Sequence, residues 1–448
     1  MKNKFRSLKL RCGINATLIT TMFIIVVLLV NMFAGLLTDK FPSLNIDLTK
    51  NRQFAITENT KEALSEINGP VSFKMLMYEQ NSEAVIEELL QRYKEIKPDI
   101  TIEKIDLAKN PTIVQKYGDV DPYGTLVIEN KDKFELVSFD SLYGNKGDLA
   151  DAESLLTNGI VATTVENKKT VLFSEGHGEY PAYGIAAIAQ KNYYNYDVID
   201  LKKTELKNDE CDMLVIYSPT VDFTQQEIAA IETYVLGGGN LQIYLNPLTQ
   251  FLPNLCEYIK EWGIEVKNET VSEKNADYVA QQGLFIPVTE ENDYTKNVDM
   301  DSYYTSSFRL DVLYSDMNSI TAVPVLTTTE DAVTVNKDSG EGEQTGKYNI
   351  SVVLERVLDN NSFVKMYVSG STLLHEQENY LYNEDICGSV LSGMLKSESY
   401  VEIPSKTTNA TTLHLNTTDF VFIIILVALI AIGVLIFGIV MWRKRRYL

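Results

Sequence analysis

The residues whose types could do chemistry gather in one short loop, Gly176-His177-Gly178-Glu179, which follows an apolar run ending at Phe173. A histidine near a glutamate can act as a general acid or base if both side chains face a cleft that perturbs their pKa values. The same residues can be structural, because a tight turn needs glycine at positive φ and polar side chains bond to neighbouring backbone. The tetrapeptide is no general enzyme signature. We therefore treat its four residues as candidates for ligand contact and predict no catalytic residue.

Two serines form a second candidate. Ser369 and Ser371 follow an apolar strand pattern at 363–368, which we expect to rejoin the central sheet and to place them at the edge where the loop lies. Serine beside histidine suggests a hydrolase. However, the chain has no G-x-S-x-G elbow, and the sequence does not place an acid that would orient His177. We predict ligand contact for both serines.

The elements that must position these residues alternate between strand and helix patterns from 170 to 247. Thr224 and Glu227 form a capping box at the start of a helix that Gly237 to Gly239 end. This order predicts a flavodoxin- or amidotransferase-like α/β domain with a parallel sheet, whose ligands lie beyond the carboxyl ends of the strands. The predicted strands are 171–173, 196–201, 213–217 and 241–245, and a further helix is predicted at 183–190.

The segment before this unit predicts a separate domain. Its patterns follow a β-α-β-α-β-β order, with strands at 71–77, 100–107, 125–128 and 134–139 and helices at 82–96 and 113–117. That order is thioredoxin-like in outline, but no C-x-x-C dithiol is present, which excludes a thiol oxidoreductase. We expect a redox-dead binding or packing module.

Several elements are predicted around and beyond the central unit. A helix at 149–166 is expected to bridge the two domains, and a strand at 264–266 is expected at the sheet edge. Tyr303, Tyr304 and Phe308 could line a ligand surface or belong to the core; aromatic residues at strand spacing favour the core. Other predicted elements are helices at 251–262 and 383–395, strands at 320–326 and 350–356, and a solvated loop at 337–347.

Metal and cofactor chemistry has no support in the sequence. The four cysteines show no metal-ligand spacing, and the three histidines lie far apart: Cys12, Cys211, Cys256, Cys387, His177, His375 and His414. Cys211 and Cys256 lie beside apolar runs, which favours small buried side chains over a disulfide. We predict no metal and no cofactor.

Two uncharged apolar runs, 12–38 and 420–442, are long enough to span a bilayer as helices. Basic tails at 1–11 and 443–448 place both termini in the cytoplasm and residues 39–419 outside, in the plasma membrane. A cleaved signal peptide is the alternative for the first run. The formal net charge is −21 and the tails carry five and four basic residues, so about −30 remains for the rest by subtraction. An acidic ectodomain argues against nucleic acid as a partner.

The chain resembles the GldG-like family, the extracytoplasmic auxiliary component of gliding-motility-type ABC transport systems. The resemblance rests on the G-H-G-E loop, on Leu214-Val-Ile-Tyr-Ser-Pro-Thr220, on Gly237-Gly-Gly-Asn-Leu241 and on the opening Asp47-Leu-Thr49. It implies partnership with an ABC-type permease and its ATPase, and no catalytic residue. The family often has an acidic residue where this chain has Ser371, so no ion-binding role is carried over.

These observations predict a two-span, membrane-anchored α/β ectodomain with a first domain at 39–148, a second at 149–405 and a linker at 406–419. We expect a non-catalytic auxiliary subunit that binds a substrate or partner, and the chain has no G-x-x-x-x-G-K-[ST] loop with which to hydrolyse ATP. The alternative is a membrane-tethered hydrolase acting on cell-envelope glycan or peptide through His177 and Glu179. A sensory receptor is disfavoured because the cytoplasmic tails are short. Homodimerisation, the transported substrate and any part in motility stay open.

Overall fold

The computed structural model describes most of the chain between residues 54 and 406. No helix among the described residues is long and apolar enough to cross a membrane. The predicted spans at 12–38 and 420–442, the tails and the linker beyond Lys406 lie outside the described residues, except for five helical residues between 21 and 32. The described residues also include Val401, Ile403 and Lys406. The main described range is 54–395, with the exception of 79–82, 119, 122, 144–148, 281–283, 297, 299–300, 314–315, 318–319, 359–362 and 373–382.

The first sheet has four strands in the order β2-β1-β3-β4. β1 pairs in parallel with β2 and antiparallel with β3, and β3 and β4 form an antiparallel hairpin. The predicted β-α-β-α-β-β order is confirmed, and the ranges of β1 and α4 agree with those expected. The elements are α2 (Glu58–Glu66), β1 (Val71–Met77), α3 (Ala84–Ile96), β2 (Thr101–Asp106), α4 (Ile113–Tyr117), β3 (Thr125–Asn130), β4 (Lys133–Ser138), α5 (Phe139–Tyr143) and α6 (Ala152–Ala162).

The helix α6 packs in the core of this first sheet. Leu155, Leu156 and Ile160 of α6 share one buried cluster with Phe73 of β1 and Ile128 of β3. Residues from 149 onwards were expected in the second domain, whereas α6 packs with the strands of the first. The apolar content of α6 explains the observed position, since ten of its eleven residues are buried and such a helix must be covered.

The second sheet contains a parallel half in the order β17-β8-β7-β5-β6. The strand β7 is buried on both faces, as expected, because all five of its residues are buried. The predicted return of the late strand to this sheet is confirmed by its parallel pairing with β8. The strands are β5 (Thr170–Glu175), β6 (Asn195–Asp200), β7 (Met213–Tyr217), β8 (Asn240–Tyr244) and β17 (Phe363–Ser369).

Helices cover the two faces of the parallel half. α7 (Tyr183–Lys191) and α10 (Glu384–Leu395) bury apolar side chains in the cluster that contains Met213, Val215 and Tyr217 of β7. α8 (Gln225–Leu236) and α9 (Pro253–Glu261) do so in the cluster that contains Leu214 and Ile216. The alternation along β7 therefore divides the core into two layers, one on each side of the sheet.

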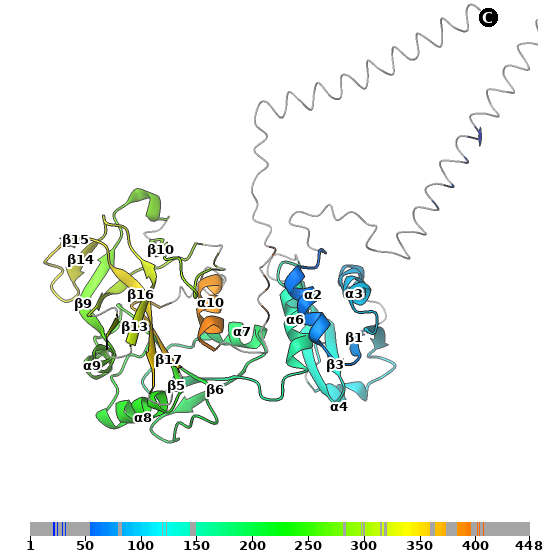
Figure 1. Ribbon diagram of the computed structural model, residues 1–448, viewed down its shortest axis with the longest axis horizontal. Coiled ribbons are helices and arrows are strands. Elements are labelled where there is room, and N and C mark those ends of the chain that lie inside the picture. The colour runs from blue at the N-terminus through cyan, green and yellow to red at the C-terminus, as the bar shows by residue number, and fades with distance from the viewer. Residues whose placement is uncertain are drawn as a thin grey trace, which may run out of the picture. The chain divides into compact units, whose positions relative to one another are not determined.

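The antiparallel half extends the sheet through β16 and beyond (Figure 1). The expectation that the strand from Ile264 lies at the sheet edge was wrong, because β9 lies between β14 and β11. Both partners come later in the chain, so no local pattern indicated them. Tyr304 and Phe308 are buried, which confirms the core interpretation, whereas Tyr303 is half-buried.

The strands of this half, with their short helix, are β9 (Ile264–Ser272), η2 (Ala276–Tyr278), β10 (Val288–Thr289), β11 (Ser307–Val312), β12 (Asp316–Met317), β13 (Ile320–Thr327), β14 (Val333–Asn336), β15 (Gln344–Thr345) and β16 (Asn349–Val357).

Candidate functional site

The Gly176-His177-Gly178-Glu179 loop turns sharply at the carboxyl end of β5, and both glycines are needed there. Gly176 has φ +106° and Gly178 has φ +65°, conformations that other residues adopt only with strain. A Cβ atom on Gly178 would also lie 2.2 Å from Thr220 Oγ1. The loop therefore lies directly against the segment that follows β7.

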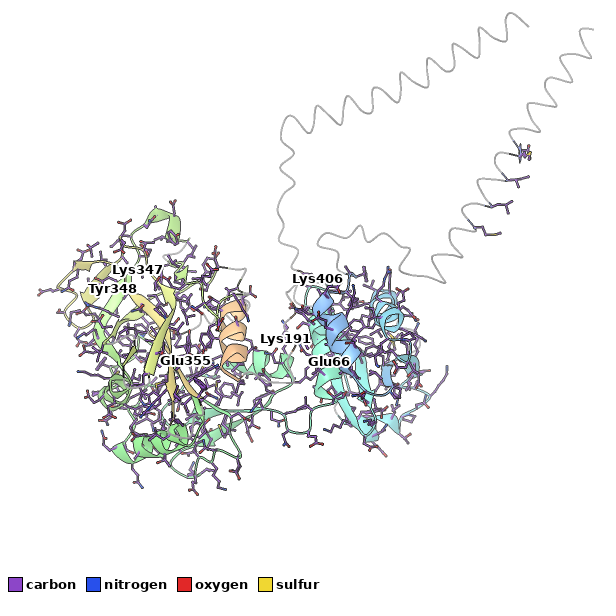
Figure 2. The ribbon with its side chains drawn as sticks, in the orientation of Figure 1. Glu66, Lys191, Lys347, Tyr348, Glu355 and Lys406 are labelled. Carbon is purple, nitrogen blue, oxygen red and sulfur yellow. The ribbon has the colours of Figure 1, made fainter. Side chains whose placement is uncertain are left out.

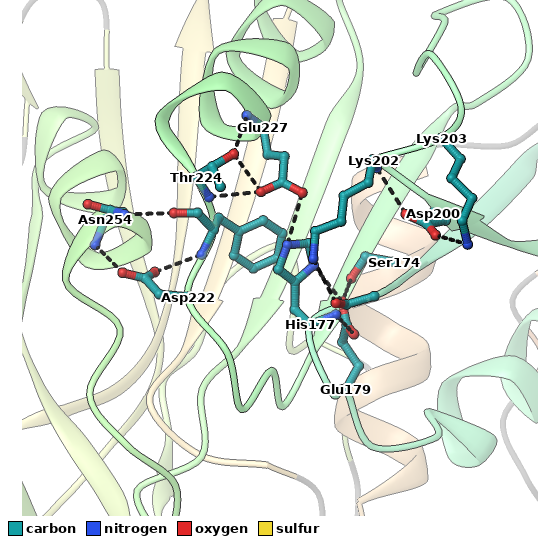
Figure 3. Close-up of polar contacts among 12 residues, drawn as sticks. Ser174, His177, Glu179, Asp200, Lys202, Lys203, Asp222, Thr224, Glu227 and Asn254 are labelled. Atoms are coloured by element: carbon teal, nitrogen blue, oxygen red, sulfur yellow. Dashed lines mark hydrogen bonds and ion pairs between the residues drawn. The ribbon is translucent and has the colours of Figure 1, made fainter.

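His177 points into the protein. Its imidazole is fully buried and stacks on Phe223, with the ring centroids 3.8 Å apart and the planes inclined by 18°. Nε2 lies 3.2 Å from Oε1 of Glu227, and Nδ1 lies 3.4 Å from Oε1 of Glu179 (Figure 3). We call His177, Glu179 and Glu227 the histidine clamp, because one ring joins the carboxylate of its own loop to a carboxylate in the first turn of α8.

Both carboxylates of the clamp have further hydrogen-bond donors. Glu179 accepts hydrogen bonds from the His177 backbone N–H at 2.7 Å and from Ser174 Oγ at 2.9 Å. Glu227 accepts hydrogen bonds from the Thr224 backbone N–H at 2.8 Å and from Thr224 Oγ1 at 2.7 Å. The predicted capping box is thus confirmed, and its glutamate also anchors the histidine. Each carboxylate of the clamp consequently accepts hydrogen bonds from several donors, whereas the contact of His177 Nδ1 with Glu179 is an ion pair without hydrogen-bond geometry.

The electrostatics of the clamp favour a charged imidazole between two charged carboxylates. Burial alone disfavours the imidazolium, but hydrogen bonds to Glu179 and Glu227 and their charges outweigh it and raise the pKa of His177. Burial likewise disfavours the carboxylates, yet the contacts with His177 and the hydrogen bonds that each accepts lower the pKa of both. An imidazolium donates from both ring nitrogens, which matches one carboxylate on either side.

Hydrogen bonds join the loops that follow three neighbouring strands. The carbonyl of His177 accepts from the backbone N–H groups of Thr220 and Val221, each at 2.9 Å. Gln250 Nε2, in the loop after β8, donates to the carbonyl of Thr220 at 2.7 Å. The loops after β5, β7 and β8 therefore form one connected edge.

Side chains beyond the clamp are exposed at this edge. The exposed fractions are 72% for Tyr183, 51% for Val221 and 80% for Leu248, each on the segment that follows a different parallel strand. The clamp side chains themselves are covered. In this arrangement a ligand would meet the exposed glycine backbone and these apolar residues, while the imidazole has no open side from which to transfer a proton to a substrate.

The two serines lie elsewhere. β17 is separated from β5 by β8 and β7, so Ser369 and Ser371 share the carboxyl edge with the loop without adjoining it. Ser369 Oγ donates to the carbonyl of Ser371 at 2.7 Å, and Ser371 Oγ donates to the carbonyl of Ser306 at 2.5 Å. Both side chains are buried and engaged with backbone. The structure therefore brings the four loop residues together but not the serines with them.

The contacts of Glu227 and Phe223 with His177 were not predicted from the sequence. It identified Glu227 as part of the capping box and Phe223 as part of a hydrophobic staple, which are local roles. A usable signal was present: β5 and β7 are both apolar strands of one parallel sheet, so the loops at their carboxyl ends must be neighbours. An acid soon after β7, such as Glu227, was therefore a candidate partner for the histidine that follows β5.

The central part of the chain matches the model of a known family. Residues 168–349 match the model of the family ABC_transp_aux, described as an ABC-type uncharacterized transport system. The name of this family indicates an auxiliary component of an ABC-type transport system. The match begins just before β5 and includes the whole histidine clamp. The narrower GldG-like assignment stays a prediction. No curated protein matches the chain.

Solved structures with similar arrangements are distant. The N-terminal domain of mmIFT52 is 16% identical, and the alignment covers 51% of this chain and 98% of that one, with a TM-score of 0.37. A glutamine amidotransferase from Thermotoga maritima is 11% identical, and the alignment covers 52% of this chain and 100% of that one, with a TM-score of 0.30. A ThuA-like protein from Parabacteroides merdae is 13% identical, with coverage of 54% and 96% and a TM-score of 0.30.

Proposed function

We propose that this protein is a non-catalytic auxiliary subunit of an ABC-type transport system, and that its parallel-sheet domain binds a substrate or a protein partner. The observation that carries the proposal is the coincidence of the family match at 168–349 with a loop whose reactive side chains are buried in a clamp. A family of transport components and a loop closed to proton transfer both favour binding over catalysis.

The geometry of the clamp weighs against the hydrolase alternative. A general base must reach the proton that it abstracts, either directly or through one water. His177 is fully buried between Glu179 and Glu227, and burial disfavours its charged form, but the contacts with both carboxylates outweigh burial and raise its pKa. Glu179 is equally engaged, since Ser174 and the His177 backbone donate to it.

The membrane tether and the partners belong to the same proposal. The apolar runs at 12–38 and 420–442 and their basic flanks support two spans with both termini in the cytoplasm. Because the chain lacks a P-loop, energy for transport would come from a partner ATPase that acts with a permease. Homodimerisation is an open alternative for the ectodomain.

The test is a mild-detergent pull-down of the tagged full-length protein, with ATPase activity assayed on what co-elutes. We expect an ABC permease and ATPase to co-purify. Tyr183→Ser and Leu248→Ser, at the exposed edge, should weaken recovery of the partner or substrate, whereas the exposed Lys207→Ala, away from this edge, should not. Recovery of the chain alone, together with hydrolysis of envelope polymers that Glu179→Gln abolishes, would favour the hydrolase instead.

A further inference from the structure

The outermost strand of the parallel half, β6, pairs on one side only. The order of strands in the second sheet ends at β6, which pairs in parallel with β5. Within the described residues, no second strand pairs with β6 on its other side. An unpaired edge presents backbone donors and acceptors to which an extended segment of another chain can add as a strand.

The hydrogen bonds of β6 decide which of its backbone groups point away from β5. The N–H of Asn195 donates to the carbonyl of Lys169, so the backbone of Asn195 faces β5. Because successive residues of a strand direct these groups to opposite sides, those of Tyr196 and Val198 point away from the sheet. The carbonyl of Asp200 has the same direction and accepts from the turn that follows the strand. The free edge is therefore centred on Tyr196 and Val198.

The side chains of these two residues are apolar and exposed. Tyr196 is 46% exposed and Val198 is 58% exposed. Their register partners in β5, Val171 and Phe173, belong to the buried cluster to which α7 contributes. The apolar layer under α7 consequently ends at β6 with two side chains that an added strand would cover.

The residue between them is an acid that no cation neutralises. Asp197 is exposed and forms no ion pair in the part of the chain that the structure describes. Its Oδ1 accepts a hydrogen bond from the backbone N–H of Val198 at 2.8 Å. Of the lysines that follow β6, Lys202 donates to a backbone carbonyl and Lys203 pairs with Asp200. The Asp197 carboxylate thus covers an outward donor and places a charge on the edge, which opposes pairing with unselected strands.

An antiparallel strand on this edge would bring one of its side chains directly to Asp197. Tyr196 and Val198 would form the hydrogen-bonded pairs of the ladder, and Asp197 would form the pair between them, where opposed side chains lie closest. A lysine or arginine at that position would pair with the carboxylate and draw it from the N–H of Val198, which could then join the ladder. Apolar residues on either side of it would cover Tyr196 and Val198.

A second copy of this chain fits the edge less well. Antiparallel pairing of two β6 strands with Tyr196 opposite Val198 also places the two Asp197 carboxylates opposite each other, and like charges in that position are destabilising. The formal net charge of −21 adds repulsion between copies. The charge of the edge therefore favours a basic segment of a different protein.

We propose that the free edge of β6 is a docking site for an extended segment of a partner protein, in which a basic residue stands between two apolar residues. The segment adds to the sheet as an antiparallel strand, with its basic residue on Asp197. This surface differs from the exposed edge formed by the loops after β5, β7 and β8. The inference therefore holds whether or not that edge binds a transport partner.

Two fluorescent peptides test the proposal on the full-length protein in mild detergent, by fluorescence polarisation. Their cores are Thr-Val-Lys-Val-Thr and Thr-Val-Glu-Val-Thr. The wild-type chain should bind the lysine peptide at least about tenfold more tightly than the glutamate peptide, and Asp197→Lys should reverse this preference. Glu66→Lys, an equal reversal of charge at the exposed end of α2 (Figure 2), is the matched control and should leave the preference unchanged.

Hydrogen exchange locates the bound peptide. With saturating lysine peptide the Tyr196 amide should exchange roughly tenfold more slowly, while the amides of β7 keep their rates. If Asp197→Lys does not fold, Asp197→Asn replaces it and should remove the preference. Failure of the lysine peptide to bind, a preference that the Asp197 variants leave unchanged, or no added protection at Tyr196 would overturn the proposal. Self-association of the wild-type chain that slows exchange at Tyr196 would assign the edge to a second copy and overturn it as well.

Discussion

Replacement of His177 by alanine should destabilise the second sheet's domain in a pH-dependent way. The substitution removes the Nε2 contact with Glu227 at 3.2 Å and the Nδ1 contact with Glu179 at 3.4 Å. A hydrogen bond to a charged group contributes about 1.5–3 kcal/mol, and only the Nε2 contact has hydrogen-bond geometry, so the loss is about 2 kcal/mol at pH 6. The lower half of that range applies because both carboxylates keep other donors. For a domain of this size, the melting temperature should fall by about 4–8 °C.

The sign of the pH dependence follows from the directions of the pKa shifts. His177 has its pKa raised above the ordinary 6.5, so its contribution is complete below pH 6.5 and is lost as the pH rises through the folded-state value. Glu179 and Glu227 have pKa values lowered below 4.5, so their contribution is complete above pH 4.5 and is lost as the pH falls. The clamp should therefore stabilise most between these two values.

Differential scanning calorimetry of the full-length protein at pH 6 and pH 9 measures both effects. The difference between wild type and His177→Ala should be smaller at pH 9 than at pH 6, because a ring that loses its charge as the pH rises has only one N–H to donate. Lys202→Ala removes an exposed donor to the Gly176 carbonyl and should change stability by no more than about 0.5 kcal/mol. A shift no larger than that control, or a difference that grows towards pH 9, would refute the reasoning.

Three further predictions concern the Gly178 turn, the close backbone approach at Gly370 and the buried thiols. Gly178→Ala should lower the free energy of unfolding by about 2 kcal/mol, because position 178 has a positive φ and the added Cβ would clash with Thr220 Oγ1. Adding Thr220→Ala should restore the part of this loss that comes from the clash. Thermal unfolding measures both. Gly370→Ala should cost at least about 2 kcal/mol in the same assay, because its Cβ would lie 2.5 Å from the backbone oxygen of Phe308 and backbone cannot rotate away. Burial raises the pKa of the Cys211 thiol to about 11 and of the Cys256 thiol to about 12, so iodoacetamide at pH 8 should label neither until the protein unfolds.

Each of these predictions has an outcome that contradicts it. Equal stability of Gly178→Ala with and without Thr220→Ala would remove the clash from the explanation and leave backbone strain alone. Wild-type stability of Gly370→Ala would show that the backbone at Phe308 can move away from Gly370. Labelling of Cys211 or Cys256 in the folded protein, at the rate seen after denaturation, would show that these thiols are accessible.

Much of the local structure was determined by the sequence. The range of β7 and the capping box of α8 were predicted as observed, because apolar periodicity and cap chemistry act within a few residues. The glycines at 176 and 178 indicated a tight turn for the same reason. The order of elements around β1 to β4 also followed from patterns along the chain.

Only the tertiary structure decided what the polar residues do. His177 meets Glu227 across 50 positions, Asn158 meets Val401 across 243, and β9 has its partners on strands that come later. Periodicity records which face of an element is apolar, but it does not record which distant element covers that face. The histidine of the loop is buried in a clamp because α8, the helix that follows the neighbouring parallel strand, places Glu227 beside it.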